Sequence, residues 1–253
     1  MWDIAVDIRH KFKMNCIRLT YSLQLFYDDK PVPDKYLKAN PELIGKSALE
    51  IFDHTVKTLT DVGLMVILNN HTSTSQWCCS DDDGDGLWWS YEFPEYKFFE
   101  NCEFLARRYA NNPRVIGMDL RNELRKANGL EPSWGDGNPL TDWHRAASIV
   151  ANKVLKIAPH WLIMVSGLNY QLDLTGVQKT SVELIVPNKL VYTGHFYGFS
   201  WPIPSWNLVS YDEFKKKLFN SQTFVRGLGY PYFLGEYGNN CKDIPWKYLI
   251  RYL

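Results

Sequence analysis

The stretch Val115-Ile-Gly-Met-Asp-Leu-Arg-Asn-Glu123 decides how this chain can fold. It begins as a short apolar, strand-like run, Val115 to Leu120, and Asn122 and Glu123 follow at its carboxyl end. Similar runs recur at Cys16 to Thr20, Gly63 to Leu68, Trp161 to Ser166, Leu190 to Gly194 and Tyr232 to Glu236. Segments with helical spacing separate them, near Ser47 to Leu59, Glu95 to Asn111, Thr141 to Ile157 and Tyr211 to Leu218. This alternation predicts an α/β fold with a parallel sheet covered by helices, in one domain over residues 1–253.

The composition excludes several classes of partner. The 253 residues carry 28 Lys plus Arg and 28 Asp plus Glu, so the formal net charge is zero. A chain without a broad basic field is not expected to bind nucleic acid or an anionic membrane surface. No apolar run approaches the ~18 residues of a membrane span. We therefore expect no nucleic acid and no membrane as partner, and a monomeric chain.

Polar side chains stand repeatedly at the carboxyl ends of the predicted strands. They are Arg18, His71, Asn122 with Glu123, His195 with Tyr197, and Glu236. In a barrel, residues at these ends converge on one pocket. Aromatic residues make up 15% of the chain, and their flat rings suit sugar faces as well as cores. Two carboxylates, Glu123 and Glu236, in an aromatic pocket indicate glycoside hydrolysis, with the stereochemical outcome left open by the sequence.

These motifs resemble one known family. Asn122-Glu123 after its strand, His195-Phe-Tyr197 and Leu234-Gly-Glu236-Tyr-Gly are similar to motifs of glycoside hydrolase family five, the cellulase family, as are Asn15-Cys-Ile-Arg18-Leu and Leu68-Asn-Asn-His71. Five motifs in the family's order cover nearly the whole chain. The resemblance implies a (β/α)8 TIM barrel, no cofactor, and secretion to the extracellular space.

The resemblance also implies roles for individual residues. It implies a retaining double displacement in which Glu123 is the acid/base and Glu236 the nucleophile. By similarity, Asn122 bonds the sugar 2-hydroxyl, Arg18 and Tyr197 orient Glu236 and keep it ionised, and His71 and His195 line the site. The implied substrate is a β-linked polysaccharide, foremost β-1,4-glucan cleaved internally, with mannan, xyloglucan and β-1,3-glucan as alternatives.

The chain departs from the family in its strand count. The family barrel has eight strands, and by its order the Arg18 strand is the second and the Glu236 strand the seventh. The first and eighth strands are not visible in this sequence, so we expect an incomplete barrel. An alternative function follows, a catalytically weak or inert carbohydrate-binding remnant of such an enzyme.

Two long loops carry further candidates. Asp81, Asp83, Asp85 and Glu92 match the ligand spacing of an EF-hand calcium loop. No helix is expected to enter this loop, so we favour an acidic substrate loop and expect no metal. Trp88 in this loop and Trp201 in a later one are candidates for stacking on sugars, although packing against the barrel rim would explain either ring equally well. Cys78 and Cys79 in the first loop are candidates for a disulfide whose pairing stays open.

Overall fold

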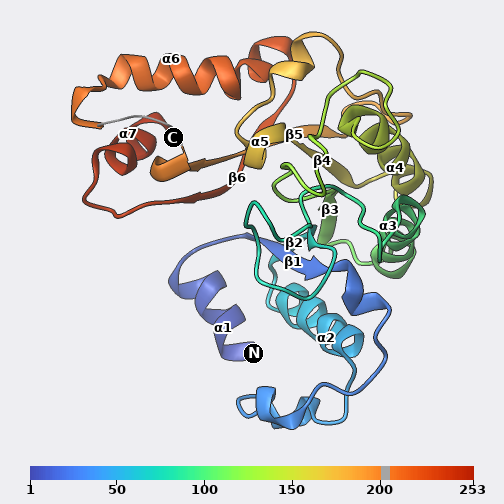
Figure 1. Ribbon diagram of the computed structural model, residues 1–253. Coiled ribbons are helices and arrows are strands. Elements are labelled where there is room, and N and C mark those ends of the chain that lie inside the picture. The colour runs from blue at the N-terminus through green and yellow to red at the C-terminus, as the bar shows by residue number, and fades with distance from the viewer. Residues whose placement is uncertain (201–205) are drawn as a thin grey trace.

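The computed structural model describes residues 1–200 and 206–253. Within these residues the strands form one parallel sheet in sequence order. They are β1 (Cys16–Ser22), β2 (Met65–Thr72), β3 (Val115–Asp119), β4 (Leu162–Ser166), β5 (Leu190–Tyr197) and β6 (Tyr232–Gly238). Figure 1 shows the sheet curling as a partial barrel from β1 to β6. The predicted fold, a TIM-type barrel that is incomplete in this chain, is therefore confirmed, with six strands among the described residues.

Helices connect successive strands and cover the outer face of the sheet, where α2, α3 and α4 follow one another (Figure 1). The helices are α1 (Trp2–Val6), α2 (Ala48–Asp61), α3 (Glu95–Tyr109), α4 (Trp143–Ile157), α5 (Leu168–Gln171), α6 (Tyr211–Ser221) and α7 (Ile244–Tyr252). The longer ones have clear start signals: Ser47 and Ser210 form capping boxes with Glu50 and Glu213, and Asp142 caps α4. No helix of the described residues is long and apolar enough to cross a membrane.

Side-chain alternation along the strands explains where the core lies and where the site lies. Val66 and Leu68 of β2 belong to the main core between sheet and helices, whereas Ile67 belongs to a small inner cluster with Met164 and Val191. Because successive side chains of a strand point to opposite faces, this cluster fills the inside of the curled sheet. The next inward positions, nearer the carboxyl ends, are polar and buried: Asn69, Ser166, Thr193 and His195. Such positions carry function in barrels of this type.

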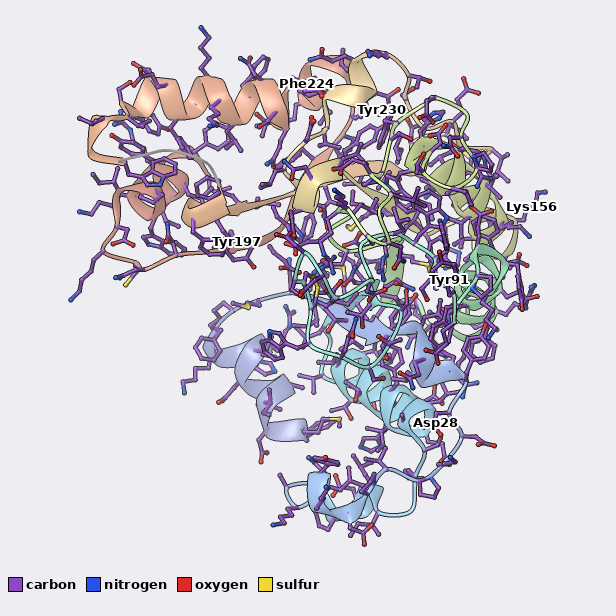
Figure 2. All side chains as sticks on the ribbon, in the orientation of Figure 1. Asp28, Tyr91, Lys156, Tyr197, Phe224 and Tyr230 are labelled. Carbon is purple, nitrogen blue, oxygen red and sulfur yellow. A yellow bond between two sulfur atoms is a disulfide. The ribbon has the colours of Figure 1, made fainter. Side chains whose placement is uncertain are left out.

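Four strands, β1, β2, β5 and β6, run further than the sequence predicts, and two of these extensions carry site residues. β2 continues through His71 and β5 continues through Tyr197. Tyr197 therefore stands on strand backbone that pairs with Gly238, and His71 lies at an irregularity of β2 between the paired residues Asn70 and Thr72. Figure 2 shows Tyr197 at the carboxyl end of β5, away from Tyr230, which precedes β6.

Candidate active site

An arginine of β1 organises the centre of the site. Arg18 donates from Nε to Asp119 Oδ2 at 2.7 Å, from Nη1 to Glu236 Oε1 at 2.6 Å, and from Nη2 to Asn122 Oδ1 at 2.7 Å. Its planar fork thus fixes three side chains that come from β3, from the turn after β3, and from β6. Burial opposes the charge of Arg18, but the carboxylates of Asp119 and Glu236 outweigh burial and raise its pKa.

Glu236 is held as a carboxylate by several neighbours. Tyr197 donates from its hydroxyl to Glu236 Oε2 at 3.0 Å, and Arg18 holds the other oxygen. Burial by itself would raise the pKa of Glu236, but the charges of His195 and Arg18 and the Arg18 hydrogen bond outweigh burial and lower this pKa below its ordinary value. A carboxylate that is ionised and oriented in this way is suited to nucleophilic attack.

Glu123 faces Glu236 across the same space. His195 Nδ1 lies 2.9 Å from Glu123 Oε1 and 3.8 Å from Glu236 Oε2, so the imidazole stands between the two carboxylates. The facing oxygens of Glu123 and Glu236 lie within 4.8 Å of each other. His195 is fully buried, and its backbone carbonyl accepts a hydrogen bond from Gln222 Nε2 at 3.0 Å, which holds the β5 backbone at this residue.

His71 lines the same site and is held neutral. Burial lowers its pKa to about 4, reinforced by the charge of Arg18 and opposed by that of Glu236. His71 Nδ1 lies 2.9 Å from Asn69 Oδ1. A neutral imidazole that donates from Nδ1 to this acceptor keeps Nε2 as an acceptor for a hydroxyl group.

This neutral histidine makes stability depend on pH. Between pH 6.5 and about 4 the unfolded chain protonates His71 while the folded chain does not, so the free energy of unfolding falls as pH falls through this window. We expect His71 to account for a loss on the order of 2 kcal/mol between pH 7 and 4.5. Denaturant unfolding of wild type and His71→Gln at both pH values measures it. The variant should lose less stability than wild type over this range, whereas the exposed control His160→Gln should match wild type. Equal losses in wild type and His71→Gln would contradict the burial account.

These side chains open into a cavity of about 930 Å³ at the carboxyl end of the sheet. Its walls combine polar and acidic side chains with aromatic rings. The polar group is His71, Asn122, Glu123 and Glu236, and the rings are Trp77, Tyr170, Tyr197 and Phe199. Trp77 is 95% exposed, and Tyr197 and Phe199 stack on each other with ring centroids 5.2 Å apart. The cavity therefore offers carboxyl groups together with flat aromatic surfaces, a combination that suits carbohydrate.

The structure brings the sequence-predicted residues of the strand ends together. Arg18, His71, Asn122, Glu123, His195, Tyr197 and Glu236 all contact one another or line this cavity. Trp88 is different, and its assignment as a sugar platform was wrong. It is only 1% exposed, packs on Trp143 at 5.5 Å and donates from Nε1 to Glu95 Oε1, so no sugar can reach its face. Trp201 lies outside the described residues.

The acidic loop after β2 folds onto the barrel through its carboxylates. Asp81 bonds the Tyr170 hydroxyl, Asp83 pairs with Arg125, and Asp85 pairs with the buried Arg121 at 2.8 Å. Within the described residues, the clusters with metal-ligand geometry are Glu123 with His195 and Glu236, and Glu123 with the two cysteines; neither includes these aspartates. Each of these three carboxylates thus has a partner within the chain, and the substrate-loop interpretation stays a prediction.

The two neighbouring cysteines of this loop form a disulfide with each other, Cys78–Cys79, at the wall of the cavity. Asn122 Nδ2 contacts both sulfurs, at 3.7 and 3.6 Å. Cys16, Cys102 and Cys241 are free. Arg18 thus holds the Oδ1 end of the Asn122 carboxamide, and the two sulfurs lie beside its Nδ2 end, which together favour one orientation of the carboxamide.

Sequence reasoning missed Asp119 and Gln171. Asp119 is fully buried beneath Arg18, and a signal for it existed, because a charged residue inside an apolar strand needs a partner. Gln171, which accepts from the Glu123 backbone N–H, follows β4 without any pattern that marks it.

A curled parallel sheet with two facing carboxylates in an aromatic-rimmed cavity defines the class of barrel glycoside hydrolases. Comparison with known proteins agrees. The family model described as cellulase, glycosyl hydrolase family 5, matches residues 3–248. The chain belongs to glycosyl hydrolase family 5.

Individual relatives show how much of their length this chain covers. An endoglucanase of Paenibacillus polymyxa is 37% identical over 209 residues, which are 78% of this chain and 50% of that protein. The major extracellular endoglucanase of Xanthomonas campestris pv. campestris is 32% identical over 66% of this chain and 32% of its own length. The chain thus spans half or less of the length of these curated relatives.

Solved structures resemble nearly the whole chain. The catalytic domain of the Xanthomonas endoglucanase has a TM-score of 0.83 at 26% identity, over 99% of this chain and 76% of that one. A cellotetraose complex of an endocellulase from Pyrococcus horikoshii has a TM-score of 0.82 at 26% identity, over 99% of this chain and 72% of that one. These solved chains therefore contain residues that this chain does not match.

Proposed function

We propose that this chain carries the active site of a retaining endo-β-1,4-glucanase. The observation that carries the proposal is the pair Glu123 and Glu236, whose facing oxygens lie within 4.8 Å in one cavity. Retaining glycosidases place their carboxyl groups ~5 Å apart, whereas inverting enzymes need ~6.5 Å or more to admit a water molecule.

The environments of the two acids support opposite roles. Glu236, bonded by Arg18 and Tyr197 and with a lowered pKa, would attack the anomeric carbon as a carboxylate. The Glu123 carboxyl group is hydrogen-bonded to His195 and not to Arg18 or Tyr197. It would give its proton to the glycosidic oxygen as the bond between that oxygen and the anomeric carbon breaks. In the second step Glu123 would take a proton from water, whose oxygen attacks the same carbon and releases Glu236 from its ester.

The remaining residues support substrate binding. The Asn122 carboxamide, oriented by Arg18 and the disulfide, would donate to a sugar hydroxyl beside Glu236. His71 would accept from a second hydroxyl. Trp77, Tyr170 and the stacked pair of Tyr197 and Phe199 would support successive sugar rings along the cavity. A chain of sugars fits this rim better than a single terminal sugar does, and the similar Pyrococcus endocellulase was solved with cellotetraose.

The substrate is tested by incubating the chain with carboxymethyl-cellulose, β-1,3-glucan, mannan and xyloglucan, and by sizing the products. We expect cello-oligosaccharides of mixed length from the β-1,4-glucan. Faster release from mannan, xyloglucan or β-1,3-glucan would reassign the substrate. Binding of cellotetraose to folded protein without any products would contradict an enzyme and favour the carbohydrate-binding alternative.

A further inference from the structure

Glu123 has a backbone conformation that its sequence neighbours do not explain. Its φ is +40°, in the left-handed region that side chains with a Cβ atom rarely adopt. The turn that faces it, after β4, is left-handed as well: Asn169, Tyr170 and Gln171 have φ of +50°, +57° and +60°. Left-handed non-glycine residues of this kind persist only when surrounding contacts hold them.

The two turns are bonded to each other. Tyr170 N donates to Leu124 O at 2.9 Å, which ties the β4 turn to the residue after Glu123. Gln171, fully buried, accepts from Glu123 N at its Oε1, at 3.0 Å. Gln171 Nε2 donates to Thr193 Oγ1 of β5 at 3.3 Å. The second bond fixes which end of the carboxamide meets Glu123, because the nitrogen end is committed to Thr193.

The opposite side of the Glu123 peptide is also held. Arg125 donates from Nη1 to Glu123 O at 2.9 Å and from Nε to Ser80 O at 3.0 Å. Gln171 and Arg125 therefore hold the N–H and the carbonyl of Glu123 between them. With both backbone groups fixed, the Cα–Cβ bond of Glu123 has one direction, and the side chain reaches His195 and the cavity.

We propose that Gln171 is a positioning residue for proton transfer by Glu123. This inference rests on the proposed acid/base role of Glu123. In that step the Glu123 proton moves to the glycosidic oxygen while Glu236 bonds the anomeric carbon and the carbon–oxygen bond breaks. A misplaced acid slows this step for a leaving group that must be protonated, and leaves it unchanged for one that departs as a stable anion.

The test compares two aryl cellobiosides, one with a phenol and one with a 2,4-dinitrophenol leaving group. Gln171→Met keeps the length of the side chain and removes both hydrogen bonds. We expect kcat/KM of this variant to fall about 10²-fold on the phenyl substrate, the loss typical of a catalytic group displaced by ~1 Å. On the dinitrophenyl substrate, kcat/KM of the variant should stay within about threefold of wild type. Added azide should raise kcat of the variant, because azide can replace water in the second step without giving a proton to Glu123.

Two controls separate positioning from general destabilisation. Glu123→Gln should show the same dependence on the leaving group, more strongly. Val177→Ala removes buried apolar volume in the nearby turn Thr175–Gln178 without touching these hydrogen bonds, and should leave both substrates unchanged. Suppose that kcat/KM of Glu123→Gln depends on the leaving group, whereas kcat/KM of Gln171→Met falls equally on both substrates or does not fall at all. The positioning role of Gln171 is then overturned, while the proposed function stands.

Hydrogen exchange of the Glu123 amide gives a readout that needs no turnover. In the folded, ¹⁵N-labelled chain this amide should exchange at least tenfold faster in Gln171→Met than in wild type or Val177→Ala. If kcat/KM of Glu123→Gln does not depend on the leaving group, the proposed function fails. The exchange rate of the Glu123 amide then still reports whether Gln171 holds the Glu123 backbone. An unchanged exchange rate in Gln171→Met overturns the inference in either case.

Discussion

Replacing Glu236 by glutamine should reduce kcat on soluble β-1,4-glucan by about 10⁴-fold or more, the scale of loss when a nucleophile is removed. The carboxamide keeps the shape of the side chain: its oxygen can still accept from Arg18, and its NH2 group can donate to the Tyr197 hydroxyl oxygen, so the fold should be retained. It is far less nucleophilic, however, and cannot form the ester. The measurement is steady-state release of reducing sugar, with circular dichroism to confirm folding.

The matched control is Glu131→Gln, the same change at an exposed position outside the cavity. It should be as active as wild type. If Glu236→Gln kept a tenth or more of the wild-type rate while folded, Glu236 would not be the nucleophile, and the assignment of the two carboxylates would be contradicted.

Arg18→Met should have the largest effect on stability. Asp119 is fully buried and its Oδ2 is bonded by Arg18 Nε, so removing the arginine leaves a buried carboxylate without its ion partner. Breaking one side of a buried pair costs about 3–5 kcal/mol. Burial already raises the pKa of Asp119, and the charge of Arg18 opposes that rise. Without Arg18 this pKa rises further, so the destabilisation should grow as pH rises from the folded-state pKa of Asp119 in wild type to its higher value in the variant, and should level off above that value.

The double variant Arg18→Met with Asp119→Asn separates stability from catalysis. A neutral carboxamide at residue 119 removes the unpaired charge, so denaturant unfolding should show much of the lost stability regained. Activity should stay about 10²-fold or more below wild type, because Glu236 and Asn122 still lack the group that orients them. If the double variant regained activity together with stability, Arg18 would be only a structural partner of Asp119.

Local patterns were sufficient to predict the framework of the fold. All six strands lie where short apolar runs predict them, since a strand buried on both faces needs such a run whatever its neighbours are. The helices likewise begin near residues that cap them, such as Ser47 and Ser210. The polar strand-end residues converge because the carboxyl ends of parallel strands meet at one edge.

The parts that the sequence did not predict depend on contacts between distant residues. The sequence around Trp88 has no feature that distinguishes a core ring from a ring that stacks on sugar. Its contact with the distant Trp143 shows that it is a core ring. Gln171 bonds Glu123, which lies 48 positions away in the sequence. The left-handed turn that carries Gln171 contains no glycine, so its sequence does not predict the left-handed conformation. Asp83 and Asp85 fit a calcium-loop spacing, yet arginines that lie after β3 bond them.

Double displacement by Glu123 and Glu236 can be tested by the anomeric form of the first product. Proton NMR can follow hydrolysis of cellotetraose by this chain before mutarotation equilibrates the new reducing end. Two displacements at the same carbon restore its configuration, so the account predicts that the β-anomer appears first and decays to the equilibrium mixture. First appearance of the α-anomer would mean a single displacement by water, and would contradict the roles given to the two carboxylates.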